Sequence, residues 1–203
     1  MNHIIGIIGT NSEQSTNRTL LTFMARHFAK DATIEVVEIK DIPMFNKPSN
    51  MEVPKEALAL AAKIEAADGV IISTPEYDHA VTASLMNALS WLSYGIYPFV
   101  DKPVMITGAS YGTLGSSRAQ AHLRQILNAP ELKARIMPSS EFLLGHSLQA
   151  FDEEGNLKDQ NQVAELEGLF SDFTTFMSIM KQLNHAHEAN KKAAENFSWE
   201  DNK

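Results

Sequence analysis

The chain has 203 residues, a formal net charge of −8, no cysteine and a hydrophobic fraction of 44%. This length suits one domain with a sizeable core, and the lack of cysteine excludes disulfides, thiol catalysis and cysteine-ligated metals. The negative charge and the absence of a basic stripe predict that nucleic acid is not a partner. No apolar run approaches the roughly 20 residues of a membrane span, and the N-terminus lacks the features of a signal peptide. We therefore expect a cytoplasmic protein with no membrane partner, which binds small molecules.

The first predicted element is a short apolar strand that ends at Gly9 and is followed by a polar loop and a helix. A helix N-terminus carries free backbone N–H groups and the positive end of the helix dipole, so it favours an anion. The loop adds hydroxyl and amide groups suited to a phosphate, on Thr10, Ser12, Ser15, Thr16 and Asn17. It contains neither GxxxxGK[ST] nor GxGxxG, so it is not a nucleoside-triphosphate P-loop and lacks the dinucleotide fingerprint. An ordinary strand-to-helix turn, capped by Ser15 or Asn17, is the alternative.

Strands and helices alternate along the rest of the chain. Further strands are predicted at residues 33–39, 69–73, 103–109 and 136–144, and further helices at residues 54–67, 85–92, 116–127 and 162–183. Five strands joined by helical crossovers predict an α/β fold with a parallel sheet covered by helices on both faces. No linker or repeat interrupts residues 1–183, which we expect to form one domain, and residues 184–203 form a polar C-terminal tail, either a solvated helix or a frayed end.

Three polar or glycine-containing loops follow predicted strands, at residues 9–17, 74–82 and 109–117. In open α/β sheets, ligands bind beyond the carboxyl ends of the strands, where the strand order reverses. Glycines at 112 and 115 permit backbone to approach a flat ligand closely. These loops predict a ligand site at one edge of the sheet. The seven histidines show no metal-binding spacing, so we expect no metal.

The same loops carry a family resemblance. Residues 9–17 resemble the G-[ST]-x-x-x-x-S-x-N signature of NADPH-dependent FMN reductases. Residues 74–78 with 87–93 resemble the TPEYN…NAxDWxS segment of that family, and residues 102–120 resemble its KPV…GAS.G..GG.RAQ segment. The likeness covers about residues 4–127 in order and at family spacing. It implies a flavodoxin-like fold, a five-stranded parallel sheet in the order 2-1-3-4-5, and FMN as the cofactor.

The resemblance also implies a role for each part of the site. The FMN phosphate would contact Thr10, Ser12, Ser15 and Asn17, with Thr16 beside them. The backbone of Pro75, Glu76, Tyr77 and Asp78 would line the pyrimidine side of the flavin ring. The other flank would be closed by Ser110, Gly112 and Thr113. No side chain is expected to act as a catalytic acid or base, because the flavin supplies the redox chemistry.

The implied activity is hydride transfer from NADPH or NADH through bound FMN to a small-molecule electron acceptor, such as a quinone, an azo compound or free flavin. One alternative is a flavin reductase that supplies reduced FMN to a partner. Another is a non-enzymatic electron carrier like flavodoxin. Members of the family form homodimers or homotetramers, and this chain has an aromatic stretch that a single small domain need not bury by itself, formed by Trp91, Tyr94, Tyr97 and Phe99.

Three positions depart from the family pattern or leave a choice open. Ser12 stands where many relatives carry arginine, so a cationic phosphate contact is missing. Asp78 stands where many carry asparagine, and a carboxylate beside the flavin would oppose the negative charge that reduction adds. We therefore expect Asp78→Asn to raise the midpoint potential by about 20 mV. Arg118 could bridge a carboxylate between subunits or contact the NADPH phosphate.

Overall fold

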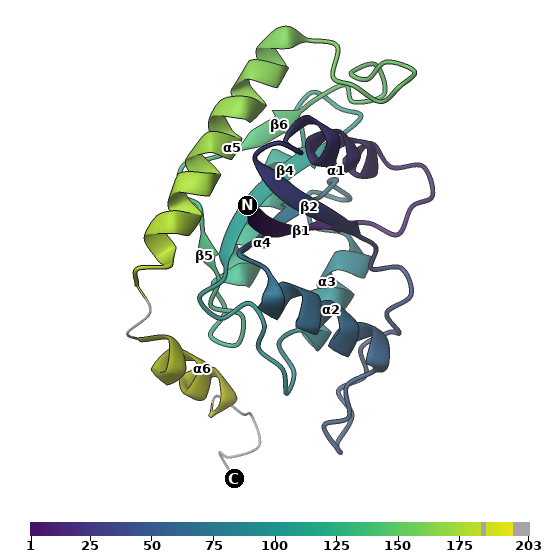
Figure 1. The fold of residues 1–203 in the computed structure, drawn as a ribbon. Coiled ribbons are helices and arrows are strands. Elements are labelled where there is room, and N and C mark those ends of the chain that lie inside the picture. The colour runs from purple at the N-terminus through teal and green to yellow at the C-terminus, as the bar shows by residue number, and fades with distance from the viewer. Residues whose placement is uncertain (184–185, 197–203) are drawn as a thin grey trace.

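The computed structural model describes residues 1–183 and 186–196. Its strands are β1 (Asn2–Ile8), β2 (Ala32–Val37), β3 (Gly69–Ser73), β4 (Pro103–Ala109), β5 (Arg135–Ile136) and β6 (Phe142–Leu144). Its helices are α1 (Thr16–His27), α2 (Lys55–Ala66), α3 (Ala83–Trp91), α4 (Ser117–Leu127), α5 (Gln160–Met180) and α6 (His187–Glu195). The strands form one parallel sheet in the order β2-β1-β3-β4-β5, and β6 also pairs with β4 (Figure 1). The predicted α/β fold and strand order are confirmed.

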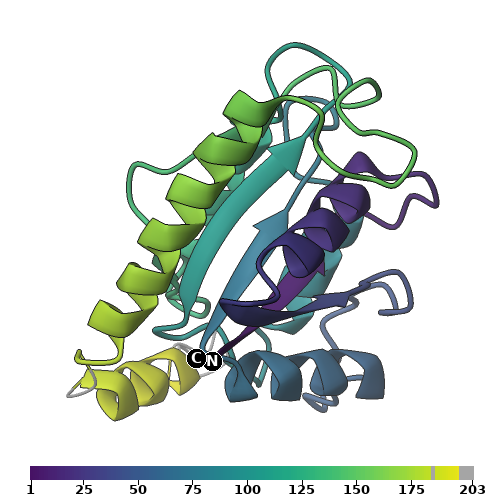
Figure 2. The same cartoon turned by 45° about the horizontal axis from the view of Figure 1, so that its top comes forward.

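The three central strands are buried on both faces, because helices cover each side of the sheet. Successive side chains of a strand point to opposite faces, so Ile5 and Ile7 of β1 pack with α2, α3 and α4. Ile4 and Ile8 point the other way and pack with α1 and α5. Figure 2 shows α1 and α5 on the same face of the sheet. None of the described helices has the length and apolar composition needed to traverse a lipid bilayer.

The single strand predicted over residues 136–144 is wrong, because two short strands take its place. β5 pairs with the start of β4, and β6 pairs with its end. Between them, Pro138 has no N–H to give to the ladder, and Ser139 adopts a left-handed φ of 52°. The Arg124 guanidinium on α4 donates to the carbonyls of Met137 and Ser140. The chain therefore leaves the sheet after β5 and returns to it at β6, and Arg124 holds the segment between them.

The aromatic stretch that begins at the end of α3 is largely buried within the chain itself. Trp91 is 3% exposed and Phe99 is fully buried. Trp91 Nε1 donates to the Pro43 carbonyl at 2.8 Å, and the Tyr94 hydroxyl donates to the Pro48 carbonyl at 2.7 Å. The inference that one domain need not bury these residues is therefore wrong for Trp91 and Phe99. Dimerisation stays a prediction that rests on the family resemblance alone.

Part of the predicted C-terminal tail forms α6, while residues 184–185 and 197–203 lie outside the described residues. Asn190 Nδ2 donates to both oxygens of Asp101, at 2.9 and 3.0 Å, and His187 Nδ1 lies 3.2 Å from the same carboxylate. Lys133 donates to Asn190 Oδ1 at 2.8 Å. Because Asp101 and Lys133 precede β4 and β5, α6 lies at the amino ends of these strands.

Candidate functional site

A cavity of about 520 Å³ opens beyond the carboxyl ends of β1, β3 and β4. This volume lies within the range of about 300–1,000 Å³ typical of small-molecule sites. The cavity sits beside the switch point of the sheet, because the chain leaves β1 for β2 on one side and reaches β3 on the other. The lining contains ten of the twelve residues predicted to bind the cofactor: Thr10, Ser15, Thr16, Asn17, Pro75, Glu76, Tyr77, Ser110, Gly112 and Thr113.

The remaining two predicted residues, Ser12 and Asp78, are not part of this lining. Six further residues, which were not predicted to contact the cofactor, complete the lining: Gln14, His79, Ala109, Tyr111, Leu114 and Arg118. Each of these is a near neighbour in sequence of a predicted residue. Five of them lie within the three predicted loops, and Arg118 follows the third loop directly, in α4.

The first loop presents a row of free backbone donors. Within the described parts of the chain, the N–H groups of residues 13–17 have no hydrogen-bond acceptor. Ser15 is the N-cap of α1, and its hydroxyl accepts from the Arg18 N–H at 3.3 Å. The buried Thr10 hydroxyl accepts from the Ser12 N–H at 3.2 Å. Free N–H groups at a helix N-terminus, next to hydroxyls, form a site for a phosphate.

The side chain of Asn17 was predicted to contact the phosphate, but in the structure it bonds to other parts of the chain. The residue is 1% exposed, and its Oδ1 accepts from the Ser73 hydroxyl and from the Ala109 N–H, both at 2.9 Å. Its Nδ2 donates to the Ala109 carbonyl at 2.9 Å. The side chain therefore joins α1 to β3 and β4. Its backbone N–H, at the second position of α1, is the group left for an anion.

Glu76 positions the second loop through its carboxylate. Oε2 accepts from the N–H groups of Arg118 and Ala119, in the first turn of α4, at 2.9 and 3.2 Å. The N-cap residue of that helix, Ser116, makes no capping bond with its side chain. The Arg118 guanidinium lies 3.3 Å from Glu76 Oε1, so the carboxylate that it bridges belongs to its own chain. Glu76 thus caps α4 across 42 residues of sequence, and no local pattern predicts this contact.

Residues 77–80 form a tight turn at the rim of the cavity. Tyr77 and Ala80 exchange two backbone hydrogen bonds, at 3.1 and 2.9 Å. Asp78 and His79 between them have φ values of 49° and 63°. Two consecutive positive φ values define a type I′ turn, where asparagine and aspartate are the best-tolerated residues after glycine. The turn accounts for an Asp or Asn at position 78 without any contact to a ligand.

Because Asp78 is exposed and outside the cavity lining, the rise of about 20 mV expected from the sequence is corrected: Asp78→Asn should raise the midpoint potential of bound FMN by no more than about 10 mV. The direction is upward because a negative charge is removed, and the size is small because water screens an exposed carboxylate. A redox titration of both proteins at neutral pH measures the shift. A rise of about 20 mV or more would contradict this placement of the side chain.

The lining fits a flavin mononucleotide. The free N–H groups and hydroxyls at the start of α1 suit its phosphate. Tyr77, Tyr111 and Leu114 are each about half exposed and offer apolar surface to a flat ring. Gly112 has no atom within 4 Å of its missing side chain, so the third loop leaves open space beside the cavity.

Comparison with known proteins identifies the family of the chain. Residues 2–149 match the family described as NADPH-dependent FMN reductase. The chain is 52% identical to the NADH:(hydroxy)cinnamate reductase subunit CrdA of Vibrio ruber, over 98% of each chain. It is 39% identical to NADH-dependent flavin reductase subunit 2 of Lactobacillus johnsonii, over 86% of this chain and 96% of that protein. The solved structure of FerB, a flavoenzyme NAD(P)H:(acceptor) oxidoreductase from Paracoccus denitrificans, shares the fold, with a TM-score of 0.80 at 23% identity, covering 89% of this chain and 99% of that one.

Proposed function

Since the chain belongs to the NADPH-dependent FMN reductase family, we propose that it holds FMN in the cavity beyond β1, β3 and β4 and reduces quinone, azo or flavin acceptors there. The family identifies the protein as an NAD(P)H-dependent FMN oxidoreductase. One observation carries the assignment of the site. The N–H groups of residues 13–17, which have no acceptor among the described residues, lie just before and at the start of α1, at the wall of a cavity of about 520 Å³.

Bound FMN would supply the hydride and electron transfer chemistry between nicotinamide and acceptor. The residues of the protein would bind the FMN and orient it. Its phosphate would be held by the hydroxyls of Thr10 and Ser15 and by the N–H groups at the start of α1. Glu76 fixes the second loop to α4, so that the backbone of this loop keeps its place along the ring. Tyr111 and Leu114 give the mouth an apolar wall, which excludes water and accepts flat substrates in turn.

Steady-state oxidation of NADH and of NADPH by the purified protein tests this function. The assay is run with and without added FMN, using benzoquinone, an azo dye and riboflavin as acceptors. We expect oxidation that depends on FMN and continues for many turnovers with at least one acceptor. If the protein oxidises neither NADH nor NADPH, the proposed enzymatic activity is refuted and an electron carrier like flavodoxin is favoured.

A second candidate function is the delivery of electrons to a partner protein. Two relatives that align over 98% and 96% of their own length are named as subunits. A chain of this kind would oxidise NADH readily with excess free FMN but slowly with the quinone and the azo dye. The same acceptor panel therefore separates the two functions.

We also propose that the protein is cytoplasmic and forms a homodimer or homotetramer. The lack of cysteine supports the first statement, and the family resemblance supports the second. Sedimentation at micromolar concentration tests the assembly, and a monomer would contradict it.

A further inference from the structure

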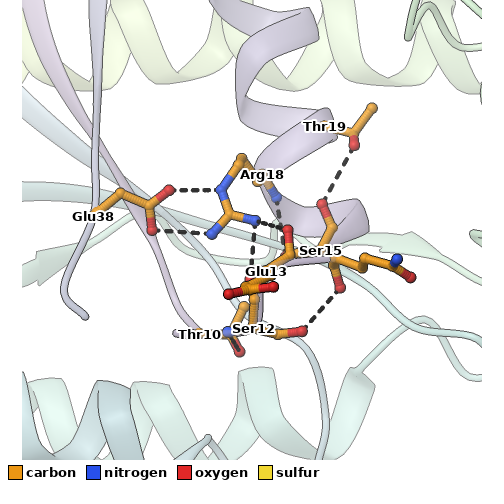
Figure 3. Close-up of polar contacts among 8 residues, drawn as sticks. Thr10, Ser12, Glu13, Ser15, Arg18, Thr19 and Glu38 are labelled. Atoms are coloured by element: carbon orange, nitrogen blue, oxygen red, sulfur yellow. Dashed lines mark hydrogen bonds and ion pairs between the residues drawn. The ribbon is translucent and has the colours of Figure 1, made fainter.

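Figure 3 shows the guanidinium of Arg18, a residue in the first turn of α1, between Glu38 and the loop that contains Ser12 and Glu13. Its Nε and Nη2 donate to the two carboxylate oxygens of Glu38, at 2.6 and 3.0 Å. Its Nη1 donates to the carbonyl oxygens of Ser12 and Glu13, both at 3.0 Å. Because Glu38 follows the end of β2, one guanidinium ties the loop to the edge of the sheet.

These bonds fix the direction of two peptide planes. In a trans peptide, the carbonyl of one residue and the N–H of the next point in opposite directions. Turning the carbonyls of Ser12 and Glu13 toward Arg18 therefore turns the N–H groups of Glu13 and Gln14 away from it. Those two N–H groups have no acceptor among the described residues, and Gln14 lines the cavity.

We propose that Arg18, anchored by Glu38, is a positioning residue that orients the N–H groups of residues 13 and 14 toward the phosphate of FMN. This proposal rests on the proposed function of the cavity. Arg18 acts from behind the loop and through its geometry. Its positive charge is already paired with the carboxylate of Glu38 through two hydrogen bonds. Only a planar guanidinium can make these two bonds together with the two carbonyl contacts.

Geometry and charge predict opposite results at Glu38. Removing the carboxylate deletes a negative charge near an anionic ligand, so electrostatics alone would tighten FMN binding. Removing the anchor frees Arg18 from its position and loosens the loop, so the positioning role predicts weaker binding. The sign of the change in Glu38→Ala decides between them.

The test compares FMN with riboflavin, which has the same ring but no phosphate, by fluorescence titration of the purified apoprotein. Arg18→Ala and Glu38→Ala are each expected to raise the Kd for FMN about tenfold, while the Kd for riboflavin stays within about twofold. Arg18→Lys keeps the positive charge but lacks the planar guanidinium with its several N–H donors, so it is not expected to restore FMN binding. Arg26→Ala is the matched control, because Arg26 also lies on α1 and donates to a loop carbonyl, that of Gly155, at 3.2 Å.

Retained riboflavin binding shows that each variant is folded. An unchanged ratio of FMN to riboflavin affinity in Arg18→Ala would overturn the positioning role, as would tighter FMN binding by Glu38→Ala or full rescue by Arg18→Lys. If the unaltered protein binds FMN and riboflavin equally, the phosphate site itself is refuted. If it prefers FMN and Arg18→Ala does as well, only the role of Arg18 fails.

Discussion

Replacing Gly108 with alanine is expected to lower the free energy of unfolding by about 3 kcal/mol and to weaken FMN binding more than about tenfold. Gly108 is near the carboxyl end of β4, where an added Cβ would lie 2.6 Å from the Thr74 carbonyl oxygen and would overlap the Ser116 hydroxyl. Thr74 begins the second loop of the cavity and Ser116 ends the third. Relief of the overlap therefore displaces two walls of the site. Urea denaturation followed by circular dichroism measures the stability, and flavin titration measures the affinity.

The matched control is Gly168→Ala. Gly168 is exposed on α5, and no atom lies within 4 Å of its missing side chain. Alanine there should stabilise the protein by about 0.5–1 kcal/mol, since it favours the helix and contacts nothing. Equal effects of the two substitutions would show that crowding at Gly108 is not what constrains the site.

Replacing Asn17 with alanine is expected to lower the free energy of unfolding by about 3 kcal/mol. The change leaves the N–H and the carbonyl of Ala109 buried without the partners that they have in the native protein, and it removes the acceptor of the Ser73 hydroxyl. Each unsatisfied buried group costs about 1–3 kcal/mol. FMN affinity should fall less than stability, because the backbone N–H of residue 17 is kept.

Asn161→Ala tests whether the burial of Asn17 is what matters. Asn161 occupies the second position of α5, as Asn17 does in α1, but its side chain is exposed. We expect a change within about 0.5 kcal/mol, measured by the same urea denaturation. If Asn17→Ala leaves stability unchanged but abolishes the preference for FMN over riboflavin, its side chain is a phosphate ligand after all.

The order of strands and helices could be predicted because each element carries its own periodic pattern. The apolar runs of β1, β3 and β4 are typical of strands buried on both faces, and all three end in loops rich in polar residues or glycine. Parallel topology then places those loops at one edge. This is why most of the predicted cofactor residues line one cavity.

Contacts between distant residues could not be predicted, because no local pattern encodes them. The Arg124 guanidinium of α4 holds the segment between β5 and β6, although Pro138 is a local signal against one continuous strand there. The cap of α4 comes from Glu76 in another loop. The amide of Asn17 suits a phosphate by its chemistry, yet the fold uses it to join a helix to two strands. Burial decided its role, and burial is a property of the folded chain.

Calorimetric titration of the purified apoprotein with FMN, FAD and riboflavin tests most directly that the cavity is built around a terminal phosphate at the start of α1. We expect one FMN per chain, with FMN bound more tightly than either riboflavin, which lacks the phosphate, or FAD, whose phosphate carries an adenosine group. No affinity for flavin, or tight binding of FAD with feeble binding of FMN, would contradict the account.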